Sequence, residues 1–396
     1  MACYMTMKSS NHTTTPEAPY IQRVLDLPAL LKKKSYFLFG PRQTGKTFLI
    51  RHTMEDVRVY DLLDSTVYLS LSQNPGRLAQ ELTPGERVVV IDEVQRLPVL
   101  LNEVHRLIEE HRVLFLLTGS SARKLRRGGV NLLGGRARTQ YLHPLTYTEL
   151  GNRFDMARAV ERGLLPSIYF SDDPRADLEA YVGSYLQQEI AAEGATRNVP
   201  AFSRFLKVAA LCNSRIVNFT NVAGDAQVPR TTVYEYFEIL KDTLVIHEVP
   251  SWRKSKKRKP LASSKYYFFD VGVVAALQGR EFRIGTPEFG EAFETVIFQE
   301  LIAYRDYVSG DSVEYWRTKS GFEVDFILGD HTAIEVKASK NISNQDLKSL
   351  RALSEENNLK RYLCVSQEER PRKIEKVSVV PFKQFLASLW SGEYKD

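Results

Sequence analysis

The hydrophobic and polar positions in the first part of the chain predict short buried strands that alternate with helices. Continuous apolar runs rich in β-branched and aromatic residues are typical of strands covered on both faces. Such strands are predicted at residues 36–39, 57–62, 88–91, 113–118 and 139–142. Residues 100–110 place Leu100, Val104 and Leu107 on one face of a helix. Strands that alternate with helices predict a parallel sheet with helices on both sides.

The middle of the chain predicts helices followed by a hairpin. Residues 155–199 are predicted to be helical, with a core-facing stripe at Leu178, Tyr181, Val182, Tyr185, Leu186 and Ile190. Further helices are predicted at 202–211, 218–226 and 231–240, and strands at 244–249 and 265–270. This order is typical of a winged-helix domain, with Thr231, Thr232 and Tyr234 leading the recognition helix. Such domains contact either DNA or proteins, and the sequence leaves both open.

A second α/β pattern occupies the C-terminal part of the chain. Its elements are predicted as a helix at 290–304, strands at 313–317, 324–328 and 333–336, a helix at 344–356 and a strand at 362–365. The order is therefore helix, three strands, helix, strand.

The turn after the first strand carries a phosphate-binding pattern. It reads Gly40-Pro41-Arg42-Gln43-Thr44-Gly45-Lys46-Thr47 and fits G-x-x-x-x-G-K-[ST]. A buried strand precedes it and a helix starts after it, as such a loop requires. Lys46 is predicted to lie between the β- and γ-phosphates of ATP, and the Thr47 hydroxyl to bind Mg²⁺.

Two acids end the strand at 88–91 and supply the second half of an ATP site. Asp92 is the candidate to hold Mg²⁺, directly or through water. Glu93 is the candidate base that polarises the attacking water. The alternative, a solvated strand end, does not account for the phosphate loop in the same domain.

Polar residues near later strands are candidates to complete this site. Thr118 and Ser120 could hold the attacking water as a γ-phosphate sensor, or could simply end the strand. Arg136 and Arg138 are candidates for an arginine finger, in cis or from a neighbouring subunit. Arginines in such a loop are also commonly solvated or paired with carboxylates.

These motifs together resemble a known family of predicted bacterial and archaeal ATPases. The residues that carry the resemblance, besides the phosphate loop, are Ile91-Asp92-Glu93-Val94-Gln95, Leu117-Thr118-Gly119-Ser120-Ser121, Gly135-Arg136 and Pro144-Leu145-Thr146-Tyr147-Thr148-Glu149-Leu150. The resemblance extends from about residue 21 to about residue 382. It implies an AAA+ type ATPase, with an extra strand between loop and metal acid, followed by a C-terminal domain of unknown function.

Four polar residues of the C-terminal part resemble the core of PD-(D/E)xK nucleases. They are Glu294, Asp325, Glu335 and Lys337, and Val324 stands where that motif usually has proline. The resemblance implies a restriction-endonuclease-like fold whose carboxylates bind Mg²⁺ or Mn²⁺. Two alternatives stay open: a Glu–Lys surface pair on an edge strand, and a nuclease-like fold kept for binding alone.

Charge and composition indicate which partners and which cell compartment to expect. The strongest basic run, at residues 253–259, lies beside Trp252 between the two hairpin strands. It fits a wing tip that contacts DNA or RNA, or else a solvated loop. The net charge of +6 permits nucleic acid without demanding it. The three cysteines are scattered, which is typical of a protein in a reducing compartment. No apolar run approaches the roughly 20 residues of a membrane span. We therefore expect a cytoplasmic protein with no membrane partner.

The sequence thus predicts several parts and one main activity. The parts are a disordered segment (1–19), an AAA+ type ATPase domain (20–150), a helical lid or connector (151–199), a winged-helix domain (200–285) and a restriction-endonuclease-like domain (286–396). The predicted function is Mg²⁺-dependent ATP hydrolysis coupled to nucleic-acid binding or processing. The alternative is an ATP-dependent switch whose distal domains bind only proteins. A homo-oligomer is compatible with both.

Overall fold

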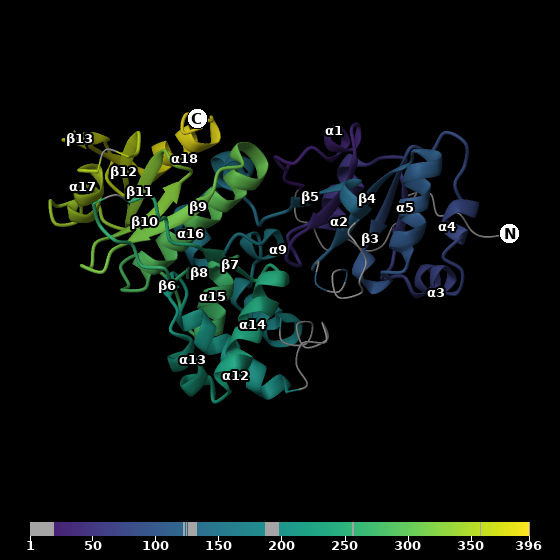
Figure 1. The fold of residues 1–396 in the computed structure, drawn as a ribbon, viewed down its shortest axis with the longest axis horizontal. Helices are drawn as coiled ribbons and strands as arrows, with labels where there is room; N and C mark the ends of the chain where they lie inside the picture. Colours follow the sequence, from purple (N-terminus) through teal and green to yellow (C-terminus); the bar gives the residue numbers. More distant parts are fainter. Residues whose placement is uncertain are drawn as a thin grey trace.

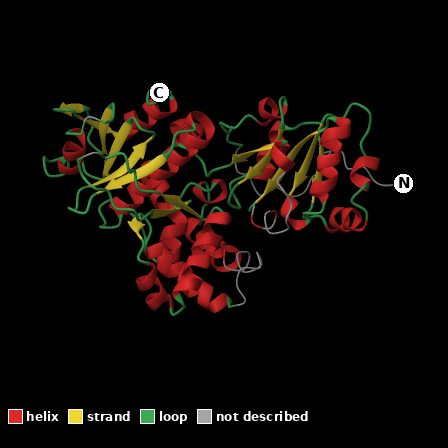
Figure 2. Ribbon diagram, in the orientation of Figure 1, coloured by secondary structure: helices red, strands yellow, loops and turns green. Residues whose placement is uncertain are grey.

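The computed structural model describes residues 20–395, except 122, 124, 126–132, 187–197, 256 and 357. A parallel sheet with its helices lies at one end of the molecule, and a larger sheet lies at the other (Figure 1). Helices of the middle region lie between and below the two sheets (Figure 2). The segment predicted to be disordered, 1–19, is outside the described residues. Within the described part, no helix is both long enough and apolar enough to cross a membrane.

The N-terminal sheet has five strands, all parallel. The strands are β1 (Ser35–Phe39), β2 (Arg58–Asp61), β3 (Val88–Asp92), β4 (Leu114–Gly119) and β5 (Ala137–Tyr141), in the order β2-β3-β4-β1-β5. The helices are α1 (Leu27–Leu31), α2 (Lys46–Thr53), α3 (Ser65–Gln73), α4 (Arg77–Gln80) and α5 (Leu100–His111). The five predicted strands and the helix at 100–110 are therefore present. Helices α3 and α4 were not predicted, and α3 begins where the Asp64 carboxylate accepts the N–H groups of Thr66 and Val67.

Alternate residues of these strands enter two different cores, as the side-chain period of two requires. Phe37, Val89 and Phe115 pack on the face that α5 covers. Leu38 and Val90 pack on the opposite face, against α1 and α2. The prediction of a parallel sheet covered on both sides is confirmed.

The middle region is helical and ends in a small antiparallel sheet. Its helices are α8 (Met156–Arg162), α9 (Pro166–Tyr169), α10 (Pro174–Ala180), the π-helix Tyr181–Leu186, α12 (Val199–Leu211), α13 (Phe219–Ala226), α14 (Arg230–Asp242) and α15 (Val271–Gln278). Its strands are β6 (Arg215–Ile216), β7 (Ile246–Val249) and β8 (Lys265–Phe268), in the order β6-β8-β7. The sequence predicted two of these strands and missed β6. In the predicted stripe Leu178, Tyr181 and Val182 are buried, and the side chains of Tyr185, Leu186 and Ile190 lie outside the described ones.

The C-terminal region is a mixed six-stranded sheet with helices. The elements are α16 (Phe289–Tyr304), β9 (Val313–Arg317), β10 (Glu323–Leu328), β11 (Thr332–Lys337), α17 (Lys348–Ser354), β12 (Arg361–Ser366), β13 (Arg372–Ile374), β14 (Val377–Pro381) and α18 (Phe382–Trp390). The strand order is β13-β14-β12-β11-β10-β9, with β12 parallel to both β11 and β14. The predicted order of helix, three strands, helix and strand is present. The elements after it, β13, β14 and α18, were not predicted.

One hydrophobic core joins the middle and C-terminal regions. It runs from Leu145 to Tyr394 and includes residues of α12, α14, β8, α16 and β11. The connection between β7 and β8 also crosses to the large sheet, where Ser251 pairs with Tyr315 and Pro260 with Thr318. The middle and C-terminal regions are therefore packed together.

This crossing gives two cations of the basic run partners in the C-terminal region. Trp252 is 1% exposed, and its indole N–H donates to the Asp330 carboxylate at 3.0 Å. Lys254 pairs with Asp330, and the Arg258 guanidinium pairs with Glu355 at 2.7 Å. Arg253, Lys254, Lys257 and Lys259 are nevertheless exposed, so contact of this loop with DNA or RNA stays a prediction.

Candidate nucleotide site

The phosphate loop has the backbone that its glycines permit. Gly45 has φ 94°, a left-handed conformation that favours glycine, and it caps the start of α2. At Gly40 a Cβ would collide with the Leu142 carbonyl at the end of β5. The Lys46 ammonium points back into the loop, where it donates to the carbonyls of Gly40 at 2.7 Å and Pro41 at 3.1 Å.

Lys46 is a buried cation held by loop carbonyls. Burial lowers its pKa to about 8, against the opposing effect of the charges on Glu93 and Asp92. A phosphate in the loop would replace these neutral oxygens by anionic ones and favour the charged ammonium. The buried ammonium of Lys46 is therefore suited to binding a polyanion in this loop.

Thr47 and Asp92 meet, although 45 residues separate them in the chain. The Thr47 hydroxyl donates to Asp92 Oδ2 at 2.7 Å. The other oxygen, Oδ1, accepts a hydrogen bond from the Thr118 hydroxyl and one from the Glu93 N–H at 3.1 Å. A hydroxyl and a carboxylate side by side are the oxygen ligands that Mg²⁺ prefers, so the two predicted metal ligands fit that ion.

Glu93 is held in place by a residue to which the sequence assigned no role. Its backbone has φ 59°, unusual for a side chain of this kind, and it is 7% exposed. The Gln95 amide donates to Glu93 Oε2 at 2.5 Å and to the Ser120 hydroxyl at 3.2 Å. A Cβ at Gly119 would collide with this amide. Gln95 therefore links the predicted base to the predicted sensor strand.

The sensor candidates and the arginine candidates differ in where they lie. Thr118 and Ser120 are at the carboxyl end of β4 and contact the site through Asp92 and Gln95. Arg138 is exposed and pairs with Tyr36 of β1. It therefore lies near the amino ends of the strands, whereas the phosphate loop follows the carboxyl end of β1. Arg136 precedes that strand and pairs with Glu109 on α5. The structure does not bring either arginine to the site of its own chain, and a role in a neighbouring subunit stays a prediction.

A second buried cation, Arg23, supports the loop from behind and was missed from the sequence. Its guanidinium donates to the Thr44 carbonyl at 2.7 Å and to the His143 carbonyl at 2.5 Å, and it pairs with Glu149 at 2.9 Å. The loop is also contacted from the helical region, where the Ser167 hydroxyl of α9 lies 3.2 Å from the Gln43 amide oxygen. The segment predicted as a lid or connector thus touches the nucleotide loop.

The four C-terminal candidates lie near one another on α16, β10 and β11. Lys337 pairs with Glu335 at 2.6 Å, and Asp325 accepts the Val336 N–H at 2.8 Å. Burial, and then the charge of Asp325, raises the pKa of Glu294 to about 8 and raises that of Glu335. Among the described residues, no three His, Cys, Asp or Glu side chains are arranged as a group that could hold a metal ion. Metal binding by these acids stays a prediction.

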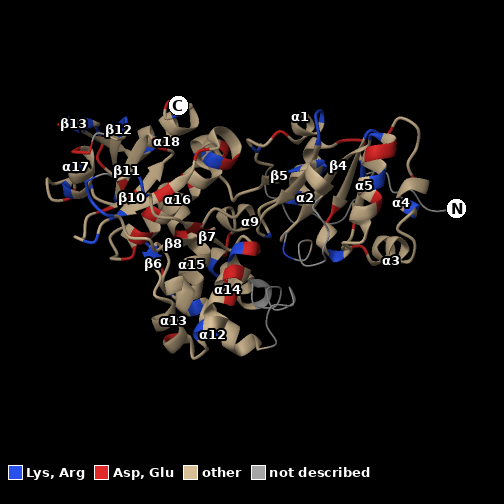
Figure 3. Ribbon diagram, viewed as in Figure 1, with Lys and Arg blue, Asp and Glu red and all other residues tan. Residues whose placement is uncertain are grey.

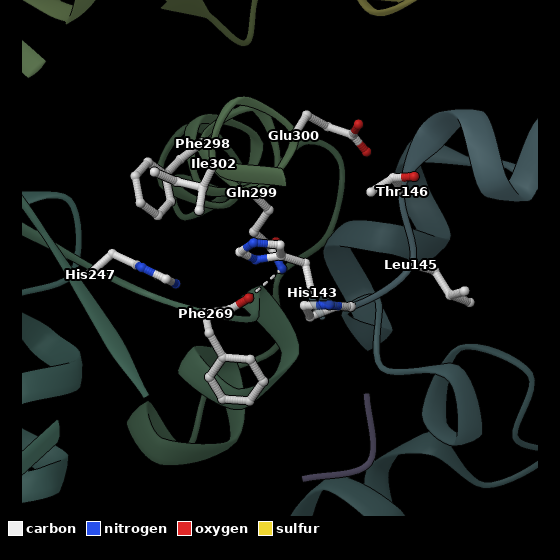
Figure 4. A pocket seen from close by; sticks show the side chains of 10 residues that line it. His143, Leu145, Thr146, His247, Phe269, Phe298, Gln299, Glu300 and Ile302 are labelled. Atoms are coloured by element: carbon white, nitrogen blue, oxygen red, sulfur yellow. Dashed lines mark hydrogen bonds between the residues drawn. The ribbon is translucent and has the colours of Figure 1, made fainter. Parts of the chain in front are cut away.

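A small pocket lies elsewhere, between the segment that follows β5 and residues of β7 and α16 (Figure 4). Burial lowers the pKa of its His247 to about 3, so that imidazole is neutral near pH 7. Glu300 accepts the Tyr147 N–H and the Trp390 indole N–H, both at 2.7 Å, and burial raises its pKa to about 8. Glu300 on α16 thus connects α7 (Tyr147–Leu150) with α18. The pocket is therefore a gap in the packing of these helices, and we assign it no ligand.

Three protein-family profiles match successive parts of the chain. Residues 32–151 match an AAA domain, residues 153–283 match a domain of unknown function (DUF8612), and residues 289–385 match another (DUF4143). With the five-stranded parallel sheet and its phosphate loop, the first match supports an AAA+ type nucleotide-binding domain.

The relatives and structures similar to this chain are remote. An uncharacterized protein of Mycobacterium tuberculosis is 26% identical over 76% of this chain and 68% of its own length. One of Haemophilus influenzae is 22% identical over 73% and 78%. Among solved structures, the Aeropyrum pernix ORC1 protein in complex with DNA has 14% identity and a TM-score of 0.30, covering 67% of this chain and 95% of that one. A Signal Transduction ATPase with Numerous Domains from Pyrococcus horikoshii has 13% identity and a TM-score of 0.23, covering 73% and 47%.

Proposed function

We propose that this protein is a Mg²⁺-dependent ATP hydrolase. The observation that carries the proposal is the 2.7 Å hydrogen bond between Thr47 and Asp92, which joins the phosphate loop to the acidic strand end. Lys46 and Glu93 lie at the same edge of the sheet. Lys46 binds the phosphates, Thr47 and Asp92 hold the metal ion, and Glu93 accepts a proton from the attacking water. The metal ion neutralises charge on the phosphates when it is bound.

Hydrolysis is coupled, in this proposal, to the middle region. Ser121 and Arg123 follow the sensor strand β4, and both contact Asp242 at the end of α14. The Arg123 guanidinium is buried and pairs with the Asp242 carboxylate at 2.7 Å. A movement of Thr118 or Ser120 on ATP hydrolysis would therefore be transmitted to α14 through Ser121 and Arg123.

ATP hydrolysis by the full chain, measured with and without DNA or RNA, tests both parts of the proposal. We expect a basal Mg²⁺-dependent rate that nucleic acid changes. A basal rate that neither DNA nor RNA alters, with no detectable nucleic-acid binding, would favour the alternative in which the distal domains bind only proteins.

We propose a winged-helix arrangement for the middle region, which is compatible with nucleic acid as the partner. Helices α12, α13 and α14 precede the strands β7 and β8, as that fold requires. The start of α14 exposes Arg230, Thr231 and Tyr234, and the Tyr234 ring stacks on Phe219 with centroids 4.2 Å apart. Figure 3 shows acidic and basic positions mixed along α14, so its contact with phosphates would be confined to this first turn.

We predict that Arg230→Ala weakens DNA binding and lowers the slope of log K against log [salt] by about 1, the share of one phosphate contact. Lys254→Ala is the matched control, because it removes an exposed cation of the basic loop that makes no phosphate contact in this proposal, and it should leave the slope unchanged. Fluorescence anisotropy with a short duplex, at several salt concentrations, measures both. If Lys254→Ala lowers the slope and Arg230→Ala does not, the DNA phosphates contact the basic loop and not the start of α14.

The C-terminal region is proposed to have a nuclease-like fold. The order of its elements, and the closeness of Glu294, Asp325 and Glu335, support this assignment. Whether its acids cut nucleic acid or only bind it is an outcome of cleavage assays with Asp325→Ala and Lys337→Ala. Either variant should leave ATP hydrolysis intact because the two sites are in separate parts of the molecule (Figure 1).

A further inference from the structure

A buried lysine from the middle region lies among the acids of the C-terminal region. Lys265 is the first residue of β8, and its side chain is 3% exposed. Its ammonium pairs with Glu323, lies 3.9 Å from Asp325 Oδ1, and lies 5.4 Å from the centre of the Tyr315 ring. None of the sequence patterns indicated that this lysine would reach the acids.

The same strand supplies a second contact to these acids. The Tyr267 hydroxyl donates to Glu294 Oε1 at 2.6 Å. Side chains two residues apart point to the same face of a strand, so Lys265 and Tyr267 reach the acids together. Strand β8 lies between β6 and β7, and both Tyr267 and Phe268 are in the shared core. The cation is therefore fixed in place by the packing of the middle region.

The charges show what this lysine does for its neighbours. Burial opposes the charged form of Lys265, but the charges of Glu294, Asp325 and Glu323 outweigh burial and raise its pKa. Lys337 acts in the same way beside Glu335. One oxygen of Glu335, Oε2, is buried and has no hydrogen-bond partner, so the Lys265 ammonium does not bind this acid.

We infer that the Lys265 ammonium is the built-in counter-ion of Glu323 and Asp325, and that it keeps a divalent metal ion from the Asp325 carboxylate. An ammonium and a divalent ion cannot both take the same carboxylate oxygens without strong repulsion. Metal binding has to be measured on the full chain. An isolated C-terminal fragment starting near residue 286 would lack Lys265 and Tyr267, which contact these acids.

The test is Mn²⁺ binding to the full chain without nucleotide, by isothermal titration, in the wild type and in Lys265→Met. Methionine keeps an unbranched side chain of similar length beside Tyr315 and removes the charge. We expect Lys265→Met to gain one bound Mn²⁺ per chain relative to the wild type, and the double variant Lys265→Met/Asp325→Asn to lose that gain. Lys254→Met, which removes an exposed and paired cation, is the matched control and should bind as the wild type does. The nucleotide site is common to all four proteins, so only differences between them count.

Two results would overturn the inference. One is a wild type that already binds Mn²⁺ in an Asp325-dependent way, as tightly as Lys265→Met. The other is a folded Lys265→Met that binds no more Mn²⁺ than the wild type. If Lys265→Met does not fold alone, refolding with and without Mn²⁺ decides: recovery only with Mn²⁺ supports the inference, and no recovery rejects it.

This inference rests on the nuclease-like proposal for the choice of acids but not on ATP hydrolysis. Failure of the ATPase proposal appears in phosphate release, whereas failure of this inference appears in Mn²⁺ stoichiometry. Metal-dependent cleavage of nucleic acid by the wild type that Asp325→Ala abolishes would contradict this inference and leave the ATPase proposal unaffected.

Discussion

Glu93→Gln is expected to slow ATP hydrolysis by about 10²- to 10⁴-fold, the usual contribution of a general base. Glutamine has the same size and still offers an oxygen to the Gln95 amide, which holds the Glu93 carboxylate at 2.5 Å in the wild type. It cannot accept a proton from water. Mg-ATP binding should therefore stay close to that of the wild type while phosphate release nearly stops.

Asp92→Asn is the matched comparison because it alters the neighbouring acid. The Asp92 carboxylate is bound by Thr47 and Thr118, so its loss should weaken the Mg²⁺-dependent part of ATP binding rather than the chemical step alone. Binding is measured by titration of ATP with and without Mg²⁺, and turnover by phosphate release. If Glu93→Gln turns over at the rate of the wild type, the base is another residue.

Lys46→Ala is expected to abolish the stabilisation of the protein by Mg-ATP. A ligand at about 100 times its Kd stabilises the folded state by about 2.7 kcal/mol, which raises the melting temperature by several degrees. Lys46 is the buried cation of the loop, and its two carbonyl partners would otherwise face the phosphates without a positive charge. Thermal melts with and without Mg-ATP measure the shift.

The control for this variant is an exposed lysine near the same sheet. Lys33→Ala, between α1 and β1, should keep the full shift, because removing it changes no contact of the loop. An unchanged melt of the wild type in saturating Mg-ATP would mean that the loop does not bind ATP.

Elements with a strong local pattern could be predicted from the sequence. The strands β1, β3 and β4 are continuous apolar runs buried on both faces, and α5 has a clear apolar stripe. By contrast, β6 has only two residues and is a strand only because β8 lies beside it. β13 is a short strand of mostly exposed residues paired with β14, and its pattern resembles a loop.

Site residues with a motif could also be predicted, and those placed by distant contacts could not. Lys46, Thr47, Asp92 and Glu93 are given by spacing and by strand ends. Arg23 reaches the phosphate loop from 21 residues away, and Lys265 reaches Asp325 from a different sheet. The acidic partners of the basic loop, Asp330 and Glu355, could not be predicted for the same reason, because they are far along the chain.

Phosphate release from saturating ATP by the full chain measures whether the loop and the acids Asp92 and Glu93 form one hydrolytic site. We expect repeated turnover in Mg²⁺, none in excess chelator, and none in Lys46→Ala. A folded wild type that binds Mg-ATP but releases no phosphate, with or without DNA or RNA, would contradict it.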